Sequence, residues 1–143
     1  MSETKTNLKA GGTHGAFSVL SVFPVADYHA VGIHLRHESG LEVFHLLNDD
    51  EENLFAFAFR TPNQKADGAA HILEHSVLCG SERFPLKDPF IRLSNQSVKT
   101  YLNAMTYPDR TVFPASSMVR ADYFNLLGVY GDAVFFPRLD PEI

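Results

Sequence analysis

The sequence contains one cysteine and no tryptophan, and it lacks both a long apolar run and a surplus of basic residues. The single cysteine, Cys79, excludes an internal disulfide, which is typical of a reducing compartment. No apolar run approaches the roughly 20 residues of a membrane-spanning helix. The 12 basic residues are scattered and outnumbered by 17 acidic ones, whereas nucleic-acid binding needs a dense basic surface. We therefore expect neither a membrane nor a nucleic acid as partner.

The length of 143 residues fits one domain, and the hydrophobic share of 45% is ordinary for a soluble globular protein. The polar N-terminus shows neither the apolar stretch of a secretory signal nor the arginine-rich pattern of a transit peptide. We expect a flexible leader over residues 1–16 and a globular part over residues 17–143. The expected compartment is the bacterial cytoplasm, with the mitochondrial matrix as the alternative.

Apolar segments with the period of two predict strands over residues 31–36, 41–47 and 54–59, and shorter strands over 101–107 and 111–113. Phe55, Phe57 and Phe59 share one face of the third segment, and we expect this face in the core.

Helical spacing predicts helices over residues 69–79, 88–98 and 119–136. Asp67 is expected to cap the start of the first helix, and Gly80 is expected to end it in a left-handed conformation. The order of elements predicts an α+β fold, with a mixed, largely antiparallel sheet and helices on one face.

The stretch AAHILEHSVLCG, residues 69–80, carries two histidines and a glutamate within five positions. At 100° per residue, His71, Glu74 and His75 fall on one side of a helix. The opposite side is small and aliphatic, and we expect it to pack on the sheet; its members are Ala69, Ile72, Leu73, Ser76 and Val77. The three polar side chains would then point into the same space.

Residues four apart on a helix are neighbours, so His71 and His75 can bind one zinc ion. Glu74 lies between them and can take a proton from a water whose pKa zinc lowers to about 7. His-x-x-Glu-His is the inverzincin motif of metallopeptidases. The alternative is that the histidines are ordinary surface or core residues and that Glu74 pairs with one of them.

The flanking sequence DGAAHILEHSVLCGSERFPLKDPF, followed by TYLNAMTYPDRTVFP and DYFNLLGVYGDAVFFP, resembles the M16 metallopeptidases, in their presequence-protease and insulinase-like branch. The resemblance begins at HESGLEVFHLLNDDEENLFAFAFRT and continues to the end of the chain. It implies an M16-like α/β roll and a zinc endopeptidase that degrades short unstructured peptides. It also implies His71 and His75 as zinc ligands and Glu74 as the general base.

In the family, a strand beside the active site receives the substrate backbone by strand addition. The resemblance places its substrate-binding positions at Asn103, Ala104 and Thr106. Asn103 can also contact the scissile region; the alternative is that its side chain only satisfies a turn or neighbouring backbone.

The chain departs from the family in its third zinc ligand, which is a glutamate on a later helix. The alignment of the surrounding blocks puts that position beyond Ile143, and Asp122, Asp132 and Glu142 do not match its context. We therefore expect an N-terminal fragment of a longer peptidase, with weak zinc binding and no appreciable turnover alone. Exposed apolar surface is expected to make the fragment self-associate.

Two other functions remain open at this point. The first is a non-catalytic interaction or assembly subunit built on the same scaffold. The second is a zinc-sensing or storage module, which would require a third ligand inside the chain. Retention of His71, Glu74 and His75 argues against the first of these.

Overall fold

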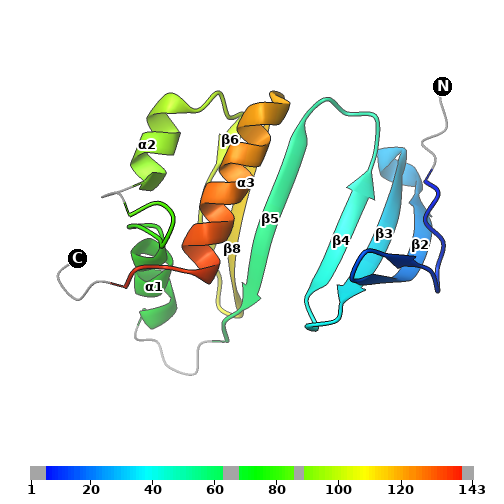
Figure 1. Ribbon diagram of the computed structural model, residues 1–143, viewed down its shortest axis with the longest axis horizontal. Helices are drawn as coiled ribbons and strands as arrows, with labels where there is room; N and C mark the ends of the chain where they lie inside the picture. Colours follow the sequence, from blue (N-terminus) through cyan, green and yellow to red (C-terminus); the bar gives the residue numbers. More distant parts are fainter. Residues whose placement is uncertain (1–5, 63–67, 86–88, 140–143) are drawn as a thin grey trace. The chain divides into compact units, whose positions relative to one another are not determined.

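The computed structural model describes residues 6–62, 68–85 and 89–139, and the chain divides into two compact units, Met1–Asp50 and Glu51–Ile143 (Figure 1). Every strand pairing among the described residues is antiparallel, and three α-helices accompany the second unit. The α+β fold expected from the sequence is therefore confirmed. None of the described helices has both the length and the apolar character needed to cross a bilayer.

The first unit is a four-stranded sheet in the order β1-β2-β3-β4. Its strands are β1 (Thr13–His14), β2 (Phe17–Val25), β3 (Ala30–His37) and β4 (Glu42–Leu47), with a 3-10 turn at Ala26–Tyr28. The strands expected over 31–36 and 41–47 are confirmed as β3 and β4. The sequence did not predict β2, because a register shift between Val19 and Ser21 breaks the period of two and Pro24 lies within the strand.

The described part of the expected leader contributes to this first sheet. Thr13 and His14 pair with β2, and Leu8 packs against the core of Val19, Ile33 and Leu35. Two backbone hydrogen bonds of 2.9 Å, from Gly11 to Val19 and from Val19 to Gly12, hold the segment in place. Residues 6–16 thus belong to the first unit.

The second unit combines a sheet with three helices. Strand β8 (Arg110–Ser117) lies between β5 (Asn53–Arg60) and the two short strands β6 (Tyr101–Leu102) and β7 (Met105–Thr106). Its helices are α1 (Ala69–Val77), α2 (Pro89–Gln96) and α3 (Arg120–Phe135). Figure 1 shows α3 lying along β8 and β5, with α1 and α2 beside it.

Helix α3 packs its apolar side on β5 and β8, as its spacing of apolar residues predicts. The expected phenylalanine stripe of β5 is confirmed as part of this core, in ring contact with α3: Phe55 meets Tyr130 edge-on, and Phe57 and Phe59 meet Phe135. Edge-to-face pairs of this kind contribute about 0.5–1.5 kcal/mol each beyond the area that they bury. The core therefore fixes α3 on the sheet.

Helix α1 begins after Gly68, whose φ of 71° is left-handed, and it ends at Val77. The expected N-cap, Asp67, lies outside the described residues. Gly80 was expected as the left-handed residue directly after the helix, but Leu78 follows Val77 in a right-handed conformation and the φ of Gly80 is 148°. The helix is therefore shorter than predicted.

The segment after α1 is tied to the end of α3. The amide of Arg138 donates to the carbonyl of Gly80 over 3.0 Å, and the amide of Glu82 donates to the carbonyl of Phe136 over 3.1 Å. The amide of Arg83 donates to Oδ2 of Asp132 over 2.9 Å. We call residues 80–83, together with their partners Asp132, Phe136 and Arg138, the α1–α3 clasp.

Candidate metal centre

The orientation of α1 differs from the one that its sequence pattern predicts. Glu74 is buried, with 5% of its surface exposed, whereas Ile72 is 65% and Leu73 48% exposed. The expected aliphatic face was therefore wrong for Ile72 and Leu73. The physical reason is that Glu74 has a hydrogen-bond partner on the sheet, so its carboxylate lies inward while both histidines remain exposed.

The imidazoles of His71 and His75 lie side by side on α1. Their Nε2 atoms are 3.1 Å apart, and their ring centroids are 4.9 Å apart at an angle of 42°. Two nitrogen ligands on one tetrahedral zinc ion, at bonds of 2.0–2.1 Å, are about 3.3 Å apart. The two Nε2 atoms therefore fit a shared zinc ion after a small adjustment.

A third ligand does not join this pair in the part of the chain that the structure describes: no three His, Cys, Asp or Glu side chains there are grouped to hold a metal. Asp122 accepts hydrogen bonds from the hydroxyl of Ser97, and Asp132 belongs to the α1–α3 clasp. Glu142 lies outside the described residues. Cys79 directs its Sγ to the carbonyl of His75 over 3.4 Å. The histidines thus supply half of a tetrahedral site.

Glu74 belongs to the same predicted site as the two histidines, but it is buried whereas they are exposed. Its Oε2 accepts a hydrogen bond of 2.6 Å from the hydroxyl of Thr106 on β7. Hydrogen bonds to a carboxylate are stronger than those between neutral groups, which offsets the cost of burying the charge. The structure therefore brings together His71, Glu74, His75 and Thr106. The other two predicted site residues, Asn103 and Ala104, line one hollow with Glu74 and His75.

The strands β6 and β7 form an open edge of the sheet beyond β8. The amides of Asn103 and Tyr107 donate to the β8 carbonyls of Pro114 and Arg110 over 3.2 and 2.8 Å. Alternate residues of an antiparallel strand turn their backbone groups to opposite sides. Ala104 and Thr106 therefore turn theirs away from β8, where none of the described strands pairs with them. We call residues 101–106 the edge segment.

The side chain of Asn103 bonds within the edge segment. Its Oδ1 accepts from the amide of Ala104 over 2.9 Å, and its Nδ2 donates to the hydroxyl of Tyr101 over 3.1 Å. This geometry agrees with the alternative in which Asn103 satisfies neighbouring backbone. The carbonyl of Asn103 accepts a bond of 3.3 Å from Tyr130, which is 1% exposed. Burial, and then the charges of Glu74 and Tyr101, raise the pKa of Tyr130, so its hydroxyl keeps the proton that it donates.

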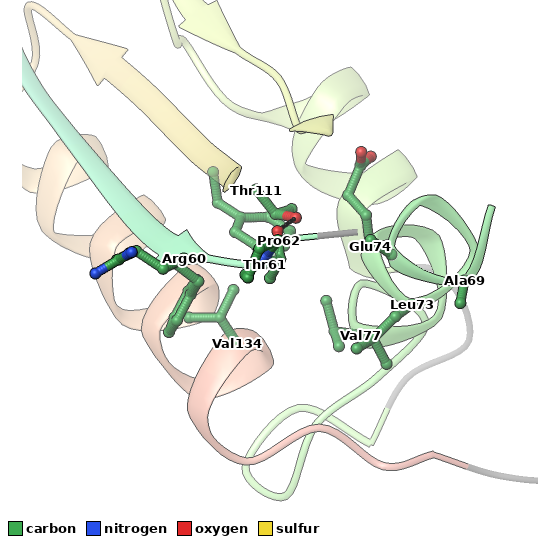
Figure 2. A pocket seen from close by; sticks show the side chains of 12 residues that line it. Arg60, Thr61, Pro62, Ala69, Leu73, Glu74, Val77, Thr111 and Val134 are labelled. Carbon is green, nitrogen blue, oxygen red and sulfur yellow. Dashed lines mark hydrogen bonds between the residues drawn. The ribbon is translucent and has the colours of Figure 1, made fainter. Parts of the chain in front are cut away.

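Among the described residues, Glu74 lies at the border of two hollows. One, of about 260 Å³, lies beside His75 and is lined mainly by apolar side chains, among them Leu78, Phe90 and Ile91. The other, of about 480 Å³, lies between α1 and the sheet. In Figure 2, Ala69, Leu73 and Val77 border this second hollow from α1, and Thr61, Pro62, Thr111 and Val134 line its other side.

Sequence reasoning missed the lining of these hollows and the role of Tyr130. The sequence pattern places Tyr130 only inside the helix expected over residues 119–136, and Phe90 only inside the one expected over residues 88–98. Neither stands in a local pattern with the histidines, because α2 and α3 reach the site through tertiary packing. The resemblance gave a signal for Asn103 and Ala104, which line the hollow beside His75, and for Thr106, which bonds to Glu74.

No family model matches the sequence. The chain is 47% identical over 115 residues to presequence protease 1, chloroplastic/mitochondrial, of Arabidopsis thaliana, covering 80% of this chain and 11% of that protein. It is 41% identical over 138 residues to the mitochondrial presequence protease of Mus musculus, covering 96% of this chain and 13% of that protein. The chain thus spans about an eighth of the length of these curated relatives.

A solved structure shares the fold. Pitrilysin superimposes with a TM-score of 0.68 at 22% sequence identity, covering 85% of this chain and 14% of the pitrilysin chain.

Proposed function

Because this chain belongs to the M16 peptidase family, with identities of 41% and 47% to two presequence proteases, we propose that it carries the catalytic helix of a zinc-dependent endopeptidase. The proposed substrates are short unstructured peptides. One observation carries the proposal: a buried carboxylate, Glu74, adjoins two histidines whose Nε2 atoms are 3.1 Å apart. This set combines two metal ligands and a base in one turn of helix.

In the proposed reaction, His71 and His75 would hold zinc through Nε2. When bound, zinc supplies a Lewis acid that polarises a carbonyl and lowers the pKa of water to about 7. Glu74 takes a proton from the attacking water as the water oxygen bonds to the peptide carbonyl carbon. Glu74 then returns that proton to the leaving nitrogen as the carbon–nitrogen bond breaks.

The edge segment suits the proposed substrate. An extended peptide can pair with the backbone groups that Thr106 turns away from β8 and with the carbonyl of Ala104, whatever the side chains of the peptide are. The amide of Ala104 already donates to Oδ1 of Asn103. The apolar hollow beside His75 can receive a side chain of that peptide. Recognition through the backbone favours unfolded peptides, because a folded protein has already paired its own backbone groups.

The proposal includes the expectation that this chain alone does not turn over peptides. Two imidazoles leave zinc short of the three protein ligands that catalytic sites normally have. The compartment also stays a prediction: the mouse relative is named as mitochondrial and the Arabidopsis relative as chloroplastic and mitochondrial.

The test uses the full-length protein that contains this sequence, with a quenched fluorescent peptide as substrate. We expect Glu74→Gln to keep stoichiometric zinc and to lower kcat by about a hundred-fold to ten-thousand-fold, since an amide cannot accept the proton. Glu82→Gln, which changes an exposed glutamate near the same helix, is the matched control and keeps its activity. Absence of both zinc and turnover in the wild type would instead support the non-catalytic subunit, and zinc without turnover would support the sensor.

A further inference from the structure

Thr106 is placed to do more than line the edge segment. Its hydroxyl donates to Oε2 of Glu74 over 2.6 Å, and both residues are shielded from solvent, Glu74 almost fully and Thr106 in part. In the portion of the chain that the structure describes, this is the hydrogen bond that the Glu74 carboxylate receives. A carboxylate at the end of a flexible side chain would otherwise sample several rotamers.

The neighbouring strand provides a direct comparison. Thr111 on β8 stands opposite Thr106 in the antiparallel pair, so the two side chains lie on the same face. The hydroxyl of Thr111, however, bonds to the hydroxyl of Thr61 over 2.8 Å. Two threonines in equivalent positions of one sheet thus have different partners, and Thr106 is the one directed at the base.

The backbone of Thr106 belongs to the other part of the site. Its amide and carbonyl turn away from β8, to the side where the proposed peptide would pair. A single residue therefore presents its backbone to the substrate edge and its side chain to the base.

We propose that Thr106 is the positioning residue of Glu74, and this inference rests on the function proposed above. The hydroxyl fixes Oε2 and leaves Oε1 as the oxygen that takes the proton. Because β7 also belongs to the edge that would bind the substrate, Thr106 fixes the distance between the Glu74 carboxylate and the bound peptide. Loss of the hydroxyl would therefore reduce the rate of the chemical step and leave peptide binding nearly unchanged.

The first test measures kcat and KM in the zinc-loaded full-length protein that contains this sequence. Thr106→Val, which keeps the shape and removes the hydroxyl, is expected to lower kcat by about ten-fold to a hundred-fold, with KM within about two-fold. Thr106→Ser restores a hydroxyl and is expected to recover kcat to within about three-fold of the wild type. The matched control is Thr111→Val, which removes a threonine hydroxyl from the paired position and is expected to leave kcat unchanged.

The second test uses the metal-free protein, so that it does not depend on turnover. The urea midpoints of Thr106→Val, Glu74→Ala and the double variant form a double-mutant cycle. We expect the two single shifts not to add, because each variant removes the same hydrogen bond. Additive shifts would overturn the inference, as would an equal kcat in Thr106→Val and Thr111→Val.

These outcomes separate the two proposals. If Glu74→Gln keeps full turnover, or if the wild type has none, the proposed function fails and the role of Thr106 fails with it. If Glu74→Gln abolishes turnover while Thr106→Val leaves kcat intact, only the role assigned to Thr106 fails.

Discussion

The hydroxyl of Tyr130, in the middle of α3, donates a hydrogen bond of 3.3 Å to the backbone carbonyl of Asn103 in the edge segment. The bond joins two parts of the second unit that are 27 residues apart in sequence. It is almost completely shielded from water, because Tyr130 is only 1% exposed. A helix that packs in the core thus reaches the strand edge proposed to receive the substrate.

Replacing Tyr130 by phenylalanine removes this bond and little else. We expect the free energy of unfolding to fall by about 0.5–1.5 kcal/mol, since the Asn103 carbonyl loses its partner. KM for a peptide should rise, because the edge segment is held less firmly. Urea denaturation and steady-state kinetics measure the two effects. Tyr28→Phe is the control, as Tyr28 is 70% exposed. Equal stability losses in the two variants would contradict this account.

Zinc binding should depend on both histidines of α1. In the full-length protein that contains this sequence, His71→Ala and His75→Ala are each expected to lose stoichiometric zinc, because only one of the two imidazoles then remains to bind the ion. Metal content after dialysis against trace zinc checks this by mass spectrometry. His45→Ala, at an exposed position of β4, should retain the metal of the wild type. Full zinc content in His71→Ala would show that the pair is not the binding site.

The α1–α3 clasp should make the free energy of unfolding depend on pH in the acid range. Burial raises the pKa of Asp132, but the nearby Ser81 hydroxyl and the amide and charge of Arg83 outweigh it, and the pKa lies below its usual range. A carboxyl with a lowered pKa in the folded state stabilises the fold above its unfolded pKa of about 3.9. That contribution is lost as the pH falls through the folded value.

We therefore expect Asp132→Asn to lower the urea midpoint at neutral pH. The difference from the wild type should narrow below about pH 4, where both proteins carry a neutral side chain. Urea midpoints across a pH series measure this, and Asp27→Asn, at an exposed position of the first unit, serves as the control. A difference that stays constant down to the lowest pH would argue against a charge effect.

Self-association of this chain by itself is expected from its exposed apolar side chains. Ile72 and Leu73 on α1 are 65% and 48% exposed, and Phe124 on α3 is 54% exposed. Sedimentation velocity should show a weight-average mass that rises with concentration. The double variant Ile72→Gln, Leu73→Gln should reduce that rise, whereas Ser76→Gln, at a more polar position of the same helix, should not. A monomer at every concentration would refute this expectation.

The sequence predicted those features that depend on local periodicity. Strands β3, β4 and β5 follow from alternation, and α1 and α3 follow from helical spacing, so the pairing of His71 and His75 on one side of α1 was also predictable. The rotation of α1 was not. An apolar pattern favours burying Ile72 and Leu73, but the partner that allows Glu74 to lie inward, Thr106, is 32 residues away. The role of Tyr130 was hidden for the same reason.

Helix α3 holds two parts of the proposed catalytic site, the edge segment and the histidine helix α1, through Tyr130 and Asp132. Residues two apart on a helix face different directions, and Tyr130 secures the edge segment while Asp132 secures the clasp behind the histidine helix. Helix α3 thus fixes the position of the metal-binding histidines relative to the bound peptide, although the proposed reaction assigns α3 no role in binding either the metal or the peptide. Random mutagenesis with a screen for lost peptide cleavage should therefore identify substitutions along α3 in proteins that still fold and bind zinc.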